Sequence, residues 1–265
     1  MFGFFVKKNF CNLWDDLFSV FVPGFIMMLV CGVSITAIIA SGFIYKSYLA
    51  VAIVGILASS ISFGFIFSFG DNALSLANWE IAPVKKYLSG IRKDFVTGVF
   101  FGAMIAILII VLFLSVPYYL KLKAQIGVVA LFLAGAIFWF AVIALFALQW
   151  FMPLHKLMSD DGFFKTLKKC FVVFFDNAGF SIAVFLHNCA LFVFTSILLC
   201  SPAAMALSLM NAMRLRLYKY DWLEAHPELT TKAEREEVPW NELLKEDRDT
   251  LGPRSFRSFI FPWVK

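Results

Sequence analysis

Four side chains with an amide or imidazole group lie inside long apolar stretches of this sequence: Gln149, His187, Asn188 and Asn211. Groups of this kind in a membrane-embedded helix either line the path of a polar solute or form hydrogen bonds to a neighbouring helix. A neutral imidazole has one donor and one acceptor and can serve in both roles. Two interpretations therefore stay open: a ligand path past these four residues, and a set of structural interhelical bonds.

His187 and Asn188 cannot serve one partner together, because adjacent residues of a helix point about 100° apart. His187 is either bonded to a hydroxyl or carbonyl of a neighbouring helix, or it is a protonatable group that contacts a ligand. No Asp, Glu, Lys or Arg lies at the centre of an apolar stretch, whereas ion-coupled and proton-coupled carriers usually need such a group. The sequence therefore disfavours a carrier of that type.

The short motifs of the common enzyme classes are missing from the sequence. It contains no G-x-S-x-G, P-loop or H-E-x-x-H pattern. The histidines His155, His187 and His226 are far apart and the cysteines form no C-x-x-C pair, so we expect neither a metal site nor a cofactor. The net charge of +5 is not gathered with readout residues on a folded domain, which argues against nucleic-acid binding. We therefore expect a protein that is not an enzyme.

These polar residues belong to a chain whose composition is typical of a membrane protein. Hydrophobic residues make up 61% of the 265 positions, against roughly 45–50% in a typical soluble domain. A helix that crosses a bilayer needs about 20 mostly apolar residues. Runs that meet this requirement are 17–44, 48–69, 95–116, 126–150 and 178–199. The first is too long for the core of a cleaved signal peptide, so we expect it to be an uncleaved span.

A sixth span is predicted from Pro202 to about Leu217. Ser201 followed by Pro202 is a typical helix start, with a hydroxyl cap and a proline in the first turn. Arg214 and Arg216 at the other end are long enough to reach the membrane surface. We therefore predict an all-α membrane protein with six transmembrane helices.

The distribution of basic residues predicts how these spans are oriented. With six spans, the short connections on one side hold only three basic residues, which are Lys46, Lys121 and Lys123. The segments on the other side hold Lys7, Lys8, Lys85, Lys86, Arg92, Lys93, Lys156, Lys165, Lys168, Lys169, Arg214, Arg216 and Lys219. Basic residues mark the cytoplasmic side of a membrane protein. We therefore expect both chain ends in the cytoplasm of a bacterium, with the protein in its cytoplasmic (inner) membrane.

Small residues and basic-aromatic segments predict two further features. Gly98, Gly102 and Ala106 form a stripe of small residues, as do Gly55 and Ser59, and such stripes let membrane helices approach closely. The segments VKKNF, VKKYL and FKTLKKCF each precede an outward-going span. Basic, aromatic segments of this kind are typical of amphipathic helices on the inner membrane surface.

The chain divides into a membrane domain, residues 1–220, and a cytoplasmic tail, residues 221–265. The tail is acidic up to residue 250 and then becomes basic and aromatic, ending in GPRSFRSFIFPWVK. Anionic lipid headgroups repel the acidic part. The end of the tail can dock on lipid, on this protein's own inner loops or on a partner. Its candidate contact residues are Phe256, Arg257, Phe259 and Trp263.

Two inner segments carry a resemblance to a known family. They read LSLANWEIAPVKKYLSGIRKDFVTGVFFG and LQWFMPLHKLMSDDGFFKTLKKCFVVFF. In the second, a span ends in an aromatic-proline element, followed by a short polar stretch, a basic helix centred on phenylalanine and the next span. This pattern resembles the YesL-type family of small bacterial multi-span membrane proteins of unknown function, over about residues 10–220.

The resemblance implies which genes lie beside that of this protein, and it implies no enzymatic activity. Members of the family often lie genetically beside carbohydrate ABC importers and polysaccharide-degrading enzymes, and no catalytic residue can be carried over. The residues that match the family's inner-loop element are Pro153, His155, Phe163 and Phe164. They are candidates for binding a partner or the membrane surface.

Two functions follow as hypotheses. The first is a non-enzymatic accessory or scaffold protein that binds subunits of a carbohydrate ABC importer, or a second copy of itself, through its inner loops and tail. The second is a small-solute permease with a path lined by His187, Asn188, Gln149 and Asn211. An importer permease itself is disfavoured, because NWEIAPVKKYLSG lacks the second alanine and the spacing of the coupling motif in those proteins.

Overall fold

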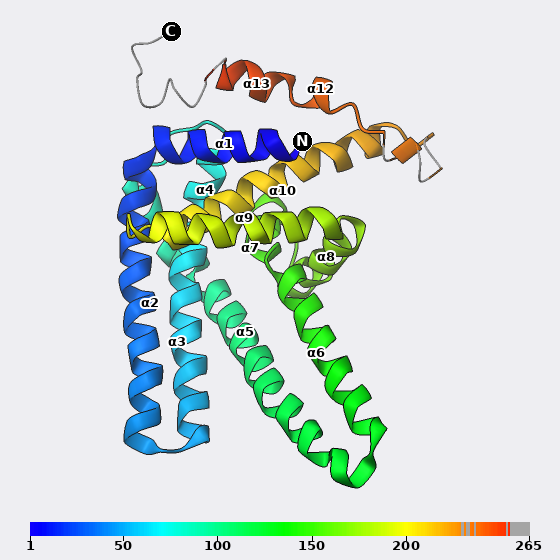
Figure 1. The fold of residues 1–265 in the computed structure, drawn as a ribbon. Coiled ribbons are helices and arrows are strands. Elements are labelled where there is room, and N and C mark those ends of the chain that lie inside the picture. Colours follow the sequence, from blue (N-terminus) through cyan, green and yellow to red (C-terminus); the bar gives the residue numbers. More distant parts are fainter. Residues whose placement is uncertain (229–230, 232–233, 236, 253, 255–265) are drawn as a thin grey trace.

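The computed structural model describes residues 1–228, 231, 234–235, 237–252 and 254, and it contains helices and no strand over these residues (Figure 1). The prediction of an all-α protein is therefore confirmed. The helices form two parts: two long hairpins that run side by side, and a group of helices gathered at one end of them.

The hairpins consist of four helices joined in pairs by short turns (Figure 1). They are α2 (Leu17–Tyr45), α3 (Tyr48–Ser68), α5 (Val84–Ile126) and α6 (Val128–Leu148). In the first turn the Ser47 side chain accepts a hydrogen bond from the Ala50 amide and begins α3. In the second turn Gly127 has φ of 61°, a left-handed conformation that glycine adopts without strain.

The two hairpins are held together by a close contact between α3 and α5. A Cβ atom at Gly102 would lie 2.5 Å from the Ser59 carbonyl oxygen, and one at Gly98 would lie 2.5 Å from the Phe63 carbonyl oxygen. Only glycine lets the backbones come this near. The hydroxyl of Ser59 donates a hydrogen bond of 3.0 Å to the Gly102 carbonyl. The small-residue stripe predicted around Gly98 and Gly102 is thus a helix contact, while Gly55 has no neighbour within 4 Å of its Cβ position.

Six further helices form a group that we call the cross layer, because two of them, α1 and α9, run crosswise to α2 and α3 (Figure 1). The cross layer comprises α1 (Phe2–Asp15), α4 (Gly70–Ala77), α7 (Phe151–Leu157), α8 (Phe163–Asp176), α9 (Ala178–Ser196) and α10 (Ser201–Ala225). Helix α10 lies at its centre and contacts α1, α2, α4, α7 and α9. A Cβ atom at Gly24 of α2 would lie 2.7 Å from the Cα atom of Cys200, so the turn between α9 and α10 packs directly on α2.

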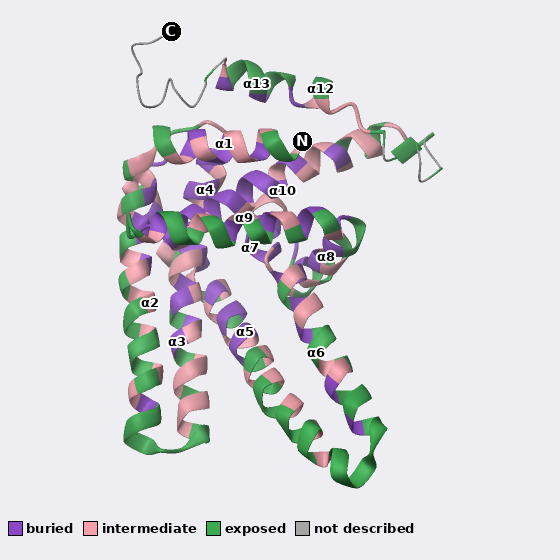
Figure 2. Ribbon diagram, viewed as in Figure 1, coloured by how far each residue is buried: buried purple, intermediate pink, exposed green. Residues whose placement is uncertain are grey.

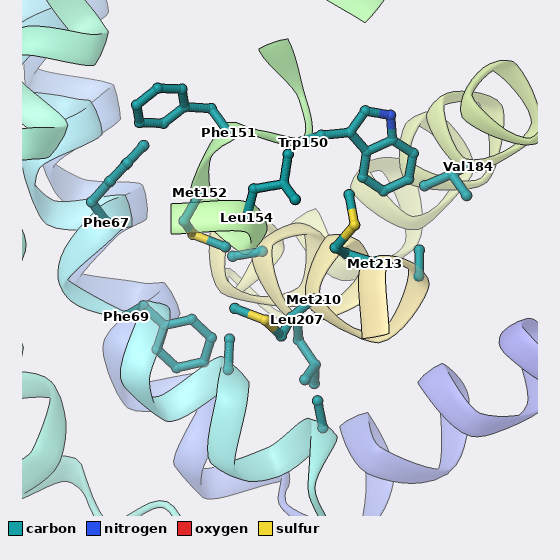
Figure 3. Close-up of a cluster of buried hydrophobic side chains, with 14 of the residues drawn as sticks. Phe67, Phe69, Trp150, Phe151, Met152, Leu154, Val184, Leu207, Met210 and Met213 are labelled. Carbon is teal, nitrogen blue, oxygen red and sulfur yellow. The ribbon is translucent and has the colours of Figure 1, made fainter. Parts of the chain in front are cut away.

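The hydrophobic core of the protein lies in the cross layer (Figure 3). Leu207, Met210 and Met213 of α10 are fully buried. They face Trp150, which immediately precedes α7, and Leu154, which lies within α7. Figure 2 shows buried residues concentrated in this layer, whereas the far halves of α2, α5 and α6 are largely exposed. Large exposed side chains there are apolar, such as Phe43, Phe113 and Phe132, as expected of surfaces that face lipid.

Among the described residues, five helical segments are long and apolar enough to cross a membrane: 17–45, 48–77, 84–126, 128–157 and 178–196. The chain is therefore of the multi-pass membrane type. The predicted sixth span is not confirmed, because α10 is not among these segments. Helix α10 does begin at Ser201, with Pro202 in its first turn, but the Ser201 side chain forms no cap and its hydroxyl contacts the Met28 sulfur at 3.5 Å.

The tail returns to the cross layer. Helices α12 (Trp240–Leu243) and α13 (Lys245–Leu251) lie beside α1 (Figure 1). Leu244 and Leu251 are buried, so this part of the tail packs on the rest of the chain. Four predicted contact residues, Phe256, Arg257, Phe259 and Trp263, lie outside the described residues.

Candidate functional site

Three of the four residues of the predicted ligand path lie in two separate polar clusters, and Asn188 lies in neither. His187 and Asn188 are on α9, Asn211 is on α10, and Gln149 lies between α6 and α7. His187 and Asn211 are joined through Asn9 of α1. The Asn9 amide nitrogen lies 3.3 Å from His187 Nε2, and the Asn211 amide nitrogen donates to Asn9 Oδ1 at 3.2 Å.

This first cluster continues into a chain of buried amides. The amide nitrogen of Asn12 donates to Asn211 Oδ1 at 3.3 Å and to the Leu76 carbonyl at 2.9 Å. Asn9, Asn12 and Asn211 are each at most 2% exposed. The chain of bonds therefore ties α1, α4, α9 and α10 together, and of its amide oxygens only Asn12 Oδ1 has no partner among the described residues.

The second cluster surrounds Gln149. Its amide nitrogen donates to the carbonyls of Phe146 and Ser181, at 2.8 Å and 3.1 Å. The neighbouring Trp150 indole donates to the Ser181 hydroxyl at 3.0 Å. Asn188 joins neither cluster, since its buried Oδ1 atom has no hydrogen-bond partner among the described residues. The four path residues therefore do not line one path. Two residues that the sequence analysis did not single out, Asn9 and Asn12, link His187 to Asn211 in a hydrogen-bond network.

A cavity of about 350 Å³ lies between the hairpins and beneath α10. Gln149 is the only one of the four path residues that lines it. The other lining residues are Phe63, Ile66, Phe67, Phe101, Ile105, Leu145, Leu148, Met152, Pro202, Met205, Ala206 and Leu209. The wall is almost wholly apolar, so this cavity suits a hydrocarbon group better than a polar solute.

The inner-loop residues predicted to bind a partner or the membrane surface lie mostly inside the protein. Pro153 is buried, and Phe163 packs on Phe151 with ring centroids 4.8 Å apart. His155 stacks on the same Phe151 ring at 6.2 Å. Phe164 differs, because 82% of it is exposed. Of these four residues, Phe164 alone presents most of its side chain to a membrane surface or a partner.

Buried ion pairs fasten the inner connections to one another. The Lys156 ammonium on α7 bonds Asp71 of α4 at 2.7 Å and also bonds Asp94 of α5. Lys156 and Asp94 are each 5% exposed at the side chain. Lys93 adds an exposed contact to Asp71. This cluster joins three helices, and all of its charges are paired within it.

A second buried pair forms the most complete polar site of the described chain, which we call the carboxylate site. It consists of Lys8 on α1, Trp79 between α4 and α5, and Tyr218 on α10, and it holds the carboxylate of Asp247 on α13. The Lys8 ammonium and the Trp79 indole each donate to Asp247 Oδ1 at 2.8 Å. The Tyr218 hydroxyl donates to Asp247 Oδ2 at 3.2 Å. The Lys8 and Asp247 side chains are 0% and 5% exposed.

The two charges of this pair are shifted by burial and by each other. Burial lowers the pKa of Lys8 to about 8, although the Asp247 charge and hydrogen bond oppose that change. Burial also acts to raise the pKa of Asp247, but the Lys8 charge and the bonds from Lys8 and Trp79 outweigh it and hold that pKa below its usual range. Both groups are therefore mainly charged at neutral pH.

Arg214 supports the carboxylate site from α10. Its guanidinium donates to the Ala77 carbonyl at 2.8 Å and to the Tyr218 hydroxyl at 3.2 Å. Sequence reasoning missed this site, because Lys8 and Asp247 are separated by almost the whole chain and Lys8 was counted only as a topology signal. The described residues contain no group of His, Cys, Asp and Glu that could hold a metal ion.

Comparison with family models, with curated proteins and with solved structures gives no match to this chain.

Proposed function

We propose that this protein is a non-enzymatic accessory or scaffold protein of a bacterial cytoplasmic membrane, which binds a partner protein through its cross layer and tail. One observation carries the proposal. His187 and Asn211, two of the side chains that a solute path would need, each bond Asn9 inside the cross layer. Gln149 bonds backbone carbonyls, and the cavity that it lines is otherwise apolar. A large, internally bonded layer on one side of the membrane suits binding better than transport.

The cross layer is proposed to face the cytoplasm, with both chain ends on that side. The support is the charge distribution: Lys46, Lys121 and Lys123 lie at or near the turns of the hairpins, and most other basic residues belong to the opposite end. Basic residues favour the cytoplasmic side. The same distribution fits six crossings or four, because residues 197–200 between α9 and α10 carry no charge.

We propose four crossings, by α2, α3, α5 and α6, in place of the six expected from the sequence. The crosswise course of α9 supports this arrangement (Figure 1). The test is an Ile197→Cys variant in a Cys189→Ser background, labelled in intact cells with a membrane-impermeant maleimide. Ile197 is 82% exposed, so with six crossings it would be labelled from outside. With four crossings it should stay unlabelled, while a control Ala124→Cys beside the second hairpin turn is labelled.

The proposed partner is a subunit of a carbohydrate ABC importer, with a second copy of this chain as the alternative. This choice rests on the resemblance of the inner segments to the YesL-type family. The experiment is to solubilise native membranes in mild detergent, purify the tagged protein and identify what accompanies it. Importer subunits in near-equal amounts are expected, and recovery of the protein alone as a monomer would contradict the proposal.

A small-solute permease is the second candidate. The observation that favours it is Gln149, whose Oε1 atom has no hydrogen-bond partner among the described residues and which lines the cavity between the hairpins. A permease should lose uptake when His187 is changed to Leu, with its amount in the membrane unchanged. The scaffold should keep its partner in the same variant.

A further inference from the structure

The carboxylate site is built from parts that do not depend on the tail. Lys8, Trp79 and Tyr218 belong to three separate segments of the cross layer. These segments are joined by other bonds, from Asn12 to the Leu76 carbonyl and from Arg214 to the Ala77 carbonyl. The three segments that carry the donors are therefore tied to one another by bonds that do not involve Asp247.

The donors of this site suit an anionic oxygen acceptor such as a carboxylate. Its base is a buried ammonium, and an indole N–H and a phenol O–H add directed hydrogen bonds. The Trp79 backbone has φ of 63°, which is uncommon for a residue other than glycine, and this conformation accompanies the placement of its indole on the carboxylate. The Lys8 ammonium also lies 4.9 Å from the centre of the Trp79 ring, a cation–π distance.

The tail presents its carboxylate as part of a helical pattern. Leu244, which caps α13, and Asp247 and Leu251 within it follow the spacing i, i+3 and i+7, which places them on one side of that helix. Leu244, Asp247 and Leu251 are buried, and Trp240 packs against the core. The intervening Lys245, Glu246, Arg248 and Asp249 are exposed. The tail thus binds its own cross layer in the way an amphipathic helix binds a groove.

Two physical features indicate that another helix can displace the tail from this site. A helix of seven residues such as α13 is not stable on its own, so the groove must supply the order that the tail lacks. A buried ion pair contributes little net stability, because desolvation of the two charges offsets their attraction. The tail keeps its place mainly because it is tethered and therefore at high effective concentration.

We propose that the carboxylate site and its apolar flanks are a docking groove for an acidic amphipathic helix of a partner protein, and that residues 240–251 of the tail occupy it in the free protein. This inference deepens the proposed scaffold function and rests on it. The occupant is a protein helix, because in the structure the site and its apolar flanks are filled by Leu244, Asp247 and Leu251 of one helical segment.

The probe for this groove is a labelled peptide of the tail itself, WNELLKEDRDTL, added to the full-length protein in detergent. Fluorescence anisotropy measures its binding. In the Asp247→Asn protein the tethered competitor is weakened, so the peptide should bind at least about tenfold tighter than to the wild type. The matched control is Asp249→Asn, an exposed acid on the same helix, which should bind the peptide as the wild type does.

Three further measurements assign any binding to the site. The double variants Lys8→Met/Asp247→Asn and Trp79→Phe/Asp247→Asn should both lose the peptide; Trp79→Phe keeps an aromatic ring and removes only the N–H donor. A peptide with Asn in place of Asp247 should not bind. Equal binding to the wild type, the Asp247→Asn protein and the double variants would overturn the proposal. A concentration-dependent dimer that Lys8→Met abolishes would assign the groove to a second copy and overturn the partner assignment.

The peptide assay tests the docking groove, and the purification of native complexes tests the scaffold function, so either proposal can be disproved without the other. If no variant changes peptide binding while importer subunits still accompany the protein, the docking groove is wrong and the scaffold function stands. If the Asp247→Asn protein gains peptide binding while the protein purifies from membranes without a partner, the groove stands and the scaffold function is wrong.

Discussion

Along the far halves of the hairpins, large apolar side chains point outward, whereas in the cross layer side chains of the same kinds are buried (Figure 2). Trp139 on α6 is 62% exposed and Trp150 at the start of α7 is 0% exposed, although only ten residues separate them. In the hairpins the bilayer supplies the apolar surroundings. In the cross layer the protein must supply them itself, and it packs as a soluble core does.

The polar groups differ between the two regions in the same way. Hairpin hydroxyls make single bonds to a backbone, as Ser59 does, or form a short chain such as Ser62 to Ser34 to the Ala58 carbonyl. The cross layer holds connected networks of amides and ion pairs, such as Asn9, Asn12 and Asn211. Networks of this kind favour one arrangement of helices over others, because any other arrangement leaves a buried polar group without a partner. The comparison therefore predicts that equal substitutions have unequal effects in the two regions.

The largest difference is expected between Trp150→Ala and Trp139→Ala. Trp150→Ala removes a buried ring and its bond to Ser181, and should lower the free energy of unfolding by about 3–5 kcal/mol. Trp139→Ala changes a surface that faces lipid and should cost less than about 1 kcal/mol. Thermal unfolding of the purified variants in one detergent compares them. Equal losses would show that the cross layer is not the core.

The close contact between the hairpins should be the next most sensitive point. In Gly102→Leu the new side chain meets the Ser59 backbone, and we expect a loss of about 1–3 kcal/mol from overpacking. Gly135→Leu on α6 is the control, since nothing lies within 4 Å of its Cβ position. Unfolding in detergent measures both, and a Gly102→Leu protein as stable as Gly135→Leu would disprove the contact of α3 with α5.

Two serines test the polar groups directly. Ser181→Ala leaves the buried Trp150 indole without an acceptor, at a cost of about 1–3 kcal/mol. Ser59→Ala removes one interhelical bond, at about 0.6 kcal/mol. The same unfolding assay applies. The reverse order of effects would contradict the greater weight of buried polar bonds in the cross layer.

The smallest effect is local and depends on pH. The pKa of Asp247 is below its usual range in the folded protein, so its contribution is complete above the unfolded pKa of about 3.9 and is lost as pH falls through the folded value. We expect α13 to remain docked from pH 5 to 7 and to be released progressively as the pH falls below about 3.9 towards the lower pKa of Asp247 in the folded protein. The charged or titratable groups that face Asp247 are Lys8, Arg214 and Tyr218.

Hydrogen exchange of the amides of residues 244–251, corrected for the intrinsic effect of pH, measures this release. At neutral pH the Asp247→Asn protein should show the same fast exchange, and Asp249→Asn should not. Protection that does not decline at any pH below about 3.9 would mean that Leu244 and Leu251 hold α13 without the ion pair.

Much of the fold follows from local patterns. The apolar runs predicted α2, α3, α6 and α9 to within a few residues, and Ser201–Pro202 marked the start of α10. The direction of α9 and α10 did not follow, because an apolar run of 19 residues has the same composition whether it crosses a bilayer or lies along it. The charge count could not decide either, since their connection is uncharged.

The candidate sites show the same limit. His187 and Asn211 stood out as polar groups in apolar surroundings, but their common partner, Asn9, lies in an N-terminal helix where an amide is unremarkable by sequence. Asp247 is one of many acids in the tail, and only its burial beside Lys8 distinguishes it. Sequence patterns detect a polar group out of place, and they cannot detect pairs that meet across the whole chain.

The sequence by itself determined that this protein is helical, apolar enough to cross a membrane several times, and more basic on one side of its spans than on the other. These properties depend on composition and on residues near one another in the chain. The tertiary structure alone decided which helices lie crosswise, which amides bond one another and that Lys8 holds Asp247. Those outcomes depend on packing and on desolvation, which exist only once distant segments have come together.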